Sequence, residues 1–200
     1  MQNSQIILVL GGARSGKSAF AQQLAQFSER SVAMIATATA SDEDMRERII
    51  RHRAARSSHW HTIEEPLKLA EAFRQAASVA DVILLDCITV WLSNWLFSQG
   101  GPDHIETAAL LSSYTNGALD AIEELLTTLA GLDASKTLIA VTNEVGLGIV
   151  PAYPIGRIYR DVLGHVNQRL AAVATRVYLM VAGLGVDIKR LHEEANLPKI

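Results

Sequence analysis

The segment GGARSGKS, residues 11–18, constrains the fold of this chain more than any other. It fits the pattern G-x-x-x-x-G-K-[ST] and stands between an apolar run, residues 5–10, and a segment of helical character. A strand, a glycine-rich turn and a helix in this order predict a loop whose backbone N–H groups point at phosphate oxygens. We expect Lys17 to neutralise the β- and γ-phosphates and the Ser18 hydroxyl to bind Mg²⁺. The residues expected to contact nucleotide here are Gly11, Gly12, Ala13, Arg14, Ser15, Gly16, Lys17 and Ser18. A chance glycine-rich turn would not need all the fixed positions, so the sequence predicts binding of a nucleoside triphosphate.

Short apolar runs alternate with helical segments along the whole chain. The apolar runs are 5–10, 31–36, 81–86, 136–142 and 176–182, and the helical segments are 17–29, 41–56, 66–78, 106–131 and 157–175. Nearly continuous apolar runs are typical of strands buried on both faces of a parallel sheet. The sequence therefore predicts one α/β domain, residues 1–200, with a core at about 5–188 and a C-terminal tail at 189–200. We expect a P-loop NTPase fold of the RecA-like type, with a mostly parallel sheet and helices on both faces. The run at 59–65 is interpreted as an extra strand, expected to be antiparallel.

Composition excludes several classes of partner. The formal net charge is −3, so no basic field attracts nucleic acid or an anionic membrane. The single cysteine, Cys87, cannot form an internal disulfide, which fits a reducing cytosol. The apolar stretch at 169–188 is interrupted by Arg176 and two glycines, so it does not predict a membrane span. We expect a cytoplasmic protein without a signal peptide and without a zinc site.

Acidic and amide side chains follow two of the apolar runs. Asp86 ends the run at 81–86, where the acidic residue that supports Mg²⁺ stands in nucleotide-binding loops of this kind. An alternative is that Asp86 caps the next helix, since Asp is a favoured N-cap residue. Asn143 and Glu144 follow another core strand, and we expect them to face the same cleft, although the sequence assigns them no role in a particular reaction step.

The helical segment at 41–56 carries an unusual face. At 100° per residue, Ile49, His52 and Arg56 fall within about 40° of Met45. The face that begins as core packing therefore ends in a histidine and an arginine. Two interpretations remain open from spacing alone: a hydrogen-bonded core histidine, or a nucleophile for phosphoryl or nucleotidyl transfer flanked by phosphate-binding guanidinium groups. The neighbouring arginines also fit a solvated helix surface; they are Arg46, Arg48, Arg51, Arg53 and Arg56.

Five motifs occur together in a characteristic order. They are GGARSGKS, DEDMRERIIRHRAARSSHW, LLDCITVWLSN, VTNEVGLGIVP and RDVLGHVNQRLA. Together they resemble the bifunctional adenosylcobinamide kinase / adenosylcobinamide-phosphate guanylyltransferase family of cobalamin biosynthesis, from about residue 6 to about residue 188. The resemblance implies a kinase step on the aminopropanol hydroxyl of adenosylcobinamide, using ATP or GTP. It implies a second step in which GMP passes from GTP to that phosphate through a GMP–histidine intermediate. The motif places this histidine at His52, with His59 as the less favoured candidate.

The same resemblance implies further site residues and an assembly. The nucleotide contacts that it adds are Thr37, Ala38, Thr39, Arg53, Ala54, Ala55, Arg56, Glu64 and Asp86. Thr39 and the two alanines depart from the family pattern, so backbone contacts are the expectation there, and Asp86 replaces a residue that can be Glu. The resemblance also implies Mg²⁺ as cofactor and a homotrimer with the active cleft near a subunit boundary. Trp91, Leu92, Trp95 and Phe97 form a buried or subunit-facing apolar patch, and the Trp91–Trp95 segment is the candidate for part of the interface.

Two rival functions share the nucleotide-binding loop. A small-molecule kinase of another pathway would not need His52 and would not release pyrophosphate from GTP. A RecA-like ATPase acting as an assembly or nucleic-acid module should have a basic surface, which the charge balance argues against.

Overall fold

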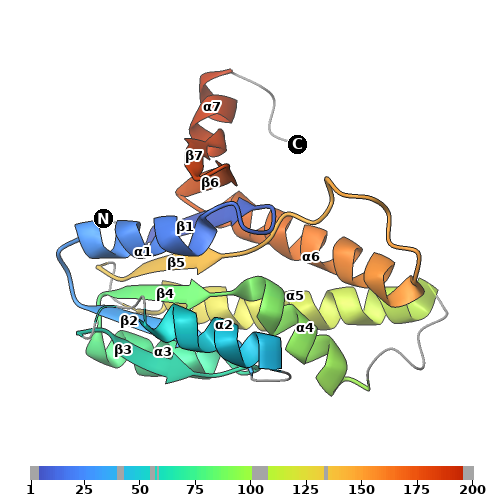
Figure 1. Cartoon of the computed structure of the whole chain (residues 1–200), viewed down its shortest axis with the longest axis horizontal. Helices are drawn as coiled ribbons and strands as arrows, with labels where there is room; N and C mark the ends of the chain where they lie inside the picture. Colours follow the sequence, from blue (N-terminus) through green and yellow to red (C-terminus); the bar gives the residue numbers. More distant parts are fainter. Residues whose placement is uncertain are drawn as a thin grey trace.

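The computed structural model describes residues 5–39, 43–54, 57, 59–100, 108–132 and 135–195; inside the helices, the side chains at 44, 45, 48, 51, 52, 54 and 108–110 are outside this description. The described strands form one seven-stranded sheet in the order β3-β2-β4-β5-β1-β6-β7 (Figure 1). The strands are β1 (Gln5–Gly11), β2 (Val32–Ala36), β3 (His61–Glu64), β4 (Val82–Asp86), β5 (Thr137–Val141), β6 (Arg176–Val181) and β7 (Leu184–Asp187). The helices are α1 (Lys17–Phe27), α2 (Glu43–Ala54), α3 (Leu69–Val79), α4 (Ile88–Ser98), α5 (Ala108–Ala130), α6 (Pro154–Val173) and α7 (Ile188–Glu194). None of the described helices is both long enough and apolar enough to cross a membrane.

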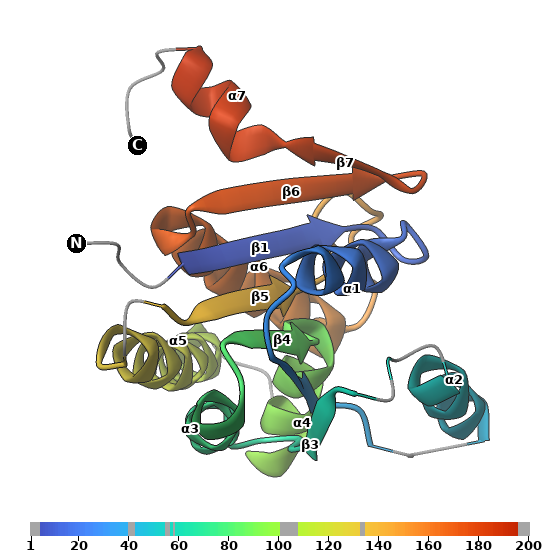
Figure 2. The ribbon, with the colours of Figure 1, turned by 90° about the vertical axis from the view of Figure 1, so that its left-hand side faces the viewer.

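The central strands are apolar on both faces because helices cover both faces. Leu8 and Leu10 of β1 belong to a core that includes residues of α3, α4, α5 and α6. Val9, between them, packs on the opposite side with Ala21 of α1. Successive residues of a strand point to opposite faces, so a doubly covered sheet needs nearly continuous apolar strands. Figure 2 shows α1 and α6 on opposite faces of the sheet. The predicted α/β fold with a mostly parallel sheet is confirmed.

The ends of the sheet differ from the sequence prediction. β3 lies within the run at 59–65 but pairs with β2 in parallel, so the expected antiparallel orientation is wrong. The long connection through α2 permits this, since parallel neighbours need a crossover rather than a hairpin. β7 pairs with β6 in antiparallel fashion after a two-residue turn, in which Ala182 and Gly183 have φ angles of 51° and 84°. β7 and α7 were not predicted.

The tryptophan-rich helix α4 packs inside the chain. Trp91 is fully buried and donates from its indole nitrogen to the carbonyl oxygen of Leu67 at 2.8 Å. Trp95 packs edge-on against Tyr114 of α5, with ring centroids 6.3 Å apart. The expectation that the Trp91–Trp95 segment forms part of a subunit interface is therefore wrong for Trp91, because its side chain is fully buried in the core of this chain. Of the patch expected there, Phe97 alone is largely exposed, at 62%.

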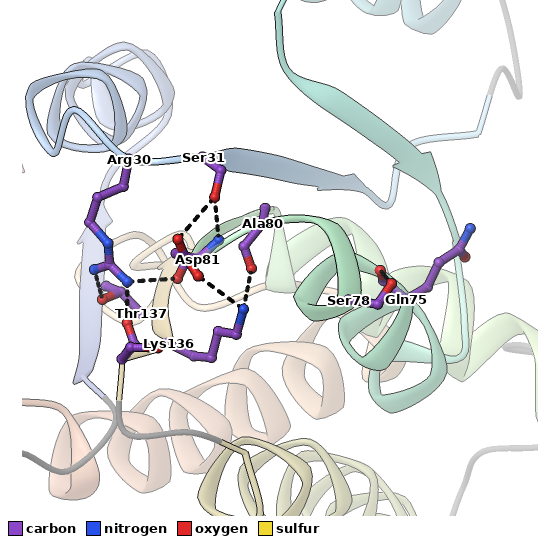
Figure 3. A network of polar contacts seen from close by, with 9 residues as sticks. Arg30, Ser31, Gln75, Ser78, Ala80, Asp81, Lys136 and Thr137 are labelled. Carbon is purple, nitrogen blue, oxygen red and sulfur yellow. Dashed lines mark hydrogen bonds and ion pairs between the residues drawn. The ribbon is translucent and has the colours of Figure 1, made fainter.

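A polar network joins the starts of three strands at the amino edge of the sheet (Figure 3). Lys136 donates to Asp81 Oδ1 at 3.0 Å, and the Ser31 hydroxyl donates to Asp81 Oδ2 at 3.1 Å. Arg30, which follows the end of α1 by three residues, donates to Thr137 Oγ1 at 3.1 Å. The hydrogen bond from Lys136, followed by that from Ser31, holds the pKa of Asp81 below its usual value. The network connects β2, β4 and β5 at the edge opposite the nucleotide-binding loop.

Replacing Asp81 by Asn should lower the free energy of unfolding by less than about 1 kcal/mol near neutral pH, because an ion pair with a carboxylate side chain 43% exposed is screened by water. The native pKa is lowered, so this stabilisation is complete above the unfolded value of about 3.9 and is lost as the pH falls through the native pKa. Urea midpoints of the variant and the wild type should converge when the pH is lowered from about 7 to about 3. A difference between midpoints that is the same at both pH values would contradict this account. The exposed Lys68–Glu71 pair provides the control variant Glu71→Gln, for which we expect a smaller difference.

Candidate nucleotide-binding site

Two glycines determine the shape of the loop between β1 and α1. Gly11 has a φ of +153°, and a Cβ there would lie 2.5 Å from the carbonyl oxygen of Met180. Gly16 has a φ of +95°, a left-handed conformation that favours glycine, and its Cβ would lie 3.2 Å from Gly183 Cα. The β6–β7 turn supports the loop from this side, where Gly183 N donates to the carbonyl oxygen of Ser15 at 3.0 Å. The loop is therefore fixed between β1 and the β6–β7 turn.

The loop presents a cation and exposed backbone at the carboxyl edge of the sheet. Lys17 is only 8% exposed, and its ammonium group donates to the carbonyl oxygen of Gly12. Gly12, Ala13 and Arg14 are exposed at the tip of the loop, where a phosphate chain has to enter. A helix that begins at Lys17 directs the backbone N–H groups of its first turn toward the same space. This geometry suits a polyphosphate.

Ser18 and Asp86 lie together, as the sequence predicted. The Ser18 hydroxyl donates to Asp86 Oδ1 at 3.3 Å, across the sheet from α1 to the end of β4. A hydroxyl and a carboxylate side by side are the hard oxygen donors that Mg²⁺ prefers, with phosphate oxygens completing its coordination. Among the described residues no cluster of three or more His, Cys, Asp or Glu side chains forms an all-protein metal site. The donor set thus fits a magnesium ion bound jointly by protein and nucleotide.

The N-cap position of α4, the helix that follows β4, is occupied by Cys87 and not by Asp86, and the Cys87 side chain makes no capping hydrogen bond. The buried Thr37 instead connects the ends of β2 and β4: its hydroxyl donates to the carbonyl oxygen of Cys87 at 2.8 Å and accepts from Cys87 N at 2.9 Å. Asn94 of α4 donates to the Thr37 carbonyl oxygen at 2.8 Å. Sequence reasoning included Thr37 but missed Asn94, whose helical position gives no signal.

A pocket of about 370 Å³ opens beyond the ends of β2 and β3. Its lining combines predicted nucleotide contacts with both charges and apolar side chains: Ala36, Ala38, Thr39, Arg46, Ile49, Ile50, Arg53, Glu64, Glu65 and Pro66. Arg53 of α2 forms an ion pair with Glu64 across this pocket. Glu65 is engaged elsewhere, accepting from Leu67 N and Lys68 N at the start of α3. The structure therefore brings four predicted residues, Ala38, Thr39, Arg53 and Glu64, to one cavity.

Helix α2 carries His52 but does not cover the sheet. Figure 2 shows α2 apart from the helices that pack on either face of the sheet. Ile49, expected to belong to the core, lines the pocket instead, and Ile50 is 57% exposed. His52 and Ala54 lie in α2 with their side chains outside the description, and Ala55 and Arg56 lie outside the described residues. The alternative histidine, His59, is exposed just before β3.

The pocket and the loop are separate parts of one edge. β2 and β1 are three strand spacings apart in the sheet, which is about 14 Å. Thr37 follows Ala36 of the pocket and contacts Cys87, the residue after Asp86 of the loop site. The two groups of predicted residues are thus joined through the turn after β2.

Asn143 and Glu144 leave β5 beside the loop, as expected from their position after a core strand. Glu144 N donates to the carbonyl oxygen of Gly11 at 3.0 Å. The Thr89 hydroxyl accepts from Asn143 N at 2.7 Å, and Asn167 donates to the Asn143 carbonyl oxygen at 3.0 Å. Tyr159 supports Thr89 by donating to its carbonyl oxygen at 2.8 Å, and burial raises the pKa of this phenol. Thr89, Asn167 and Tyr159 are not predicted, because the sequence does not show which polar residues of a helix face a neighbouring element.

Known proteins resemble this chain in sequence over nearly its full length. A family model described as "Cobinamide kinase / cobinamide phosphate guanyltransferase" matches residues 7–188. The bifunctional adenosylcobalamin biosynthesis protein CobP of Pseudomonas aeruginosa is 42% identical over 182 residues, which are 91% of this chain and 96% of the relative. The corresponding protein CobU of Escherichia coli is 42% identical over 188 residues, covering 92% of this chain and 99% of the relative.

Solved structures resemble the chain in fold. An ATP synthase subunit, NeqB, from Nanoarcheaum equitans has a TM-score of 0.52 at 13% identity, and a type III secretion ATPase from pathogenic bacteria has a TM-score of 0.53 at 12% identity. The match covers 98% of this chain in both cases, but 48% and 55% of those structures, so the chain spans about half of their length. At this identity the likeness establishes the P-loop ATPase fold alone.

The loop geometry predicts that alanine is tolerated at one of two adjacent glycines and not at the other. Gly11→Ala should lower the free energy of unfolding by about 2–4 kcal/mol, through positive-φ strain and the contact with the Met180 carbonyl. Gly12→Ala is the matched control, because a Cβ there meets nothing within 4 Å, and its stability should change by less than about 0.5 kcal/mol. Urea denaturation without nucleotide measures both. Equal stabilities of the two variants would show that Gly11 is not constrained as described.

Proposed function

The chain belongs to the cobinamide kinase / cobinamide phosphate guanyltransferase family, and on this premise we propose that it catalyses both reactions on adenosylcobinamide. It phosphorylates the aminopropanol hydroxyl with ATP or GTP, and it then transfers GMP from GTP to that phosphate, giving adenosylcobinamide-GDP. The observation that carries the proposal is the pairing, at one sheet edge, of a polyphosphate loop with a second pocket formed in part by the helix of His52.

The kinase step needs charge stabilisation and positioning, and the loop supplies both. Lys17 and the backbone N–H groups at the start of α1 neutralise the charge that develops around the transferring γ-phosphate. Ser18 and Asp86 would hold Mg²⁺, which when bound supplies further positive charge between the phosphates. The hydroxyl oxygen of cobinamide attacks the γ-phosphorus and releases its proton to water, the bond to the β,γ-bridging oxygen breaks, and the nucleoside diphosphate leaves.

The guanylyltransferase step needs a nucleophile. A neutral imidazole nitrogen of His52 attacks the α-phosphorus of GTP, and the bond to the α,β-bridging oxygen breaks to release pyrophosphate. A phosphate oxygen of cobinamide phosphate then attacks the same phosphorus, so that GMP leaves the histidine. Lys17 and the loop amides stabilise the departing pyrophosphate in this account, which is why one loop serves both steps.

The pocket beside α2 suits a guanine nucleotide. The Glu64 carboxylate can accept hydrogen bonds from the N1–H and the amino group that distinguish guanine from adenine. Arg53, its present ion-pair partner, would then be released to contact phosphate. Ile49, Ile50 and Pro66 offer apolar contact to the flat base. Thr39, Ala54 and Ala55 depart from the family pattern, and their proposed contribution is contact with the nucleotide through their backbone.

The assembly and the location of the enzyme complete the proposal. We propose a cytoplasmic homotrimer that acts on small molecules and does not bind nucleic acid. The sequence relatives favour these two reactions over the rival functions, a kinase of another pathway or a RecA-like ATPase module, because the ATPase structures share only the fold. GTP labelled in its α-phosphate separates the proposed function from both rivals, since neither rival leaves GMP on the protein.

Lys17→Ala should depress both reactions, because one loop is proposed to serve both. Loss of a charged phosphate contact in a buried setting should cost on the order of 2–4 kcal/mol of transition-state stabilisation. The measurement is kcat/KM for each step, with adenosylcobinamide and with its phosphate as acceptors. A wild-type rate in either step would refute the shared loop.

His52→Asn should separate the two reactions. The variant should still make adenosylcobinamide phosphate, because the kinase step makes no covalent demand on His52, but it should accumulate no adenosylcobinamide-GDP. It should take no acid-labile, base-stable label from α-labelled GTP, whereas the control His59→Asn should be labelled normally. Melting temperatures are measured on the same preparations. Loss of both activities with a lowered melting temperature would support the core-residue interpretation, and the reverse labelling pattern would identify His59 as the nucleophile.

A further inference from the structure

The connection from β5 to α6 exposes large apolar side chains in an uncharged segment. Residues 145–156 contain no charged side chain. Leu147 is 85% exposed, Ile149 96%, Val150 60% and Tyr153 77%. We call these four residues the apolar lip. Clustered exposure of this kind is uncommon on a surface without a binding role, whereas single exposed apolar residues are ordinary.

The lip is held in place beside the loop. Glu144, three residues before Leu147, donates from its backbone nitrogen to the carbonyl oxygen of Gly11 at 3.0 Å. At the other end, Arg157 of α6 donates to the carbonyl oxygens of Pro151 and Ala152 at 3.1 and 2.7 Å. Three residues of chain span at most about 11 Å, so the backbone of Leu147 lies within about 11 Å of Glu144, which itself contacts the start of the phosphate loop.

The acceptor of both proposed reactions needs an apolar, uncharged surface close to the phosphate loop. Cobinamide is a large ring edged by methyl groups and uncharged carboxamide arms, and its reacting hydroxyl stands on one short arm. When that hydroxyl meets the γ-phosphate at Lys17 and Ser18, the ring has to rest on the surface immediately around the loop. A ring of this chemistry favours an apolar, uncharged surface, since a charged one would be desolvated without compensation.

We propose that the apolar lip binds the corrin ring of the acceptor in both reactions, and this inference rests on the function proposed above. Leu147 and Ile149 supply apolar contact to the methyl-bearing edge, and polar backbone groups of the lip can pair with the amide arms. The nucleotide needs none of these contacts. Acceptor binding and nucleotide binding are therefore separable by mutation.

The test is the double variant L147N/I149N, with the coloured corrinoid cobinamide as the probe. Equilibrium dialysis followed by visible absorbance should show a dissociation constant raised about tenfold or more, and the KM for adenosylcobinamide should rise similarly. Formation of the GMP–enzyme adduct from α-labelled GTP should stay within about twofold of wild type, because that half-reaction uses no acceptor. The conservative variant L147M/I149M should retain wild-type binding, because it keeps the apolar surface.

Phe27→Asn is the matched control, since Phe27 is 82% exposed at the far end of α1 and should not affect cobinamide binding. Unchanged cobinamide binding in L147N/I149N, with both wild-type activities intact, would overturn the inference and leave the proposed function standing. A wild-type protein that takes no GMP label and phosphorylates no cobinamide would refute the proposed function itself. A fall in sedimentation coefficient together with loss of adduct formation in the double variant would assign the lip to a contact between subunits and would also overturn the inference.

Discussion

The parallel pairing of β1, β2, β4 and β5 is the constraint on which the rest of the site depends. Parallel strands all end at the same edge, so the loop after β1, the turn after β2, the acid at the end of β4 and the Asn-Glu pair after β5 are brought together by topology alone. Two buried cores hold this sheet, one on each face. The edge proposed to bind phosphate is therefore supported from both faces, whereas none of the described side chains of α2, the helix that bears the proposed nucleophile, belongs to either core.

The Thr37 hydroxyl makes this edge one site rather than two. It bonds the backbone after Asp86, while the residues on either side of Thr37 line the pocket beside α2. A displacement of the backbone at the end of β4 can therefore displace the residues that line the pocket, and a displacement at the pocket can move the end of β4. In the proposed account the two reactions share the phosphate loop and the acceptor surface and differ in the group that attacks phosphorus.

Much of the fold and of the site could be predicted because the signals were local. Glycine spacing at Gly11 and Gly16, the apolar strands and the acid at Asp86 each report on a conformation set by neighbouring residues. The orientation of β3 could not be predicted, because pairing with β2 is decided by a partner almost thirty residues away in the chain. For the Trp91–Trp95 segment the sequence predicts a buried or subunit-facing patch, because helical spacing does not say whether another part of the chain or another subunit covers a face. Thr89, Asn94 and Asn167 are not predicted, because a polar residue that supports the site is identified by its hydrogen-bond partner, not by its type.

The most direct test of the bifunctional account is a chase of the isolated GMP–enzyme. The protein is labelled with α-labelled GTP, freed of nucleotide and mixed with adenosylcobinamide phosphate. The account predicts that the label leaves the protein and appears in adenosylcobinamide-GDP within a single turnover, without added GTP. Label that stays on the protein, while product still forms when free GTP is supplied, would contradict it.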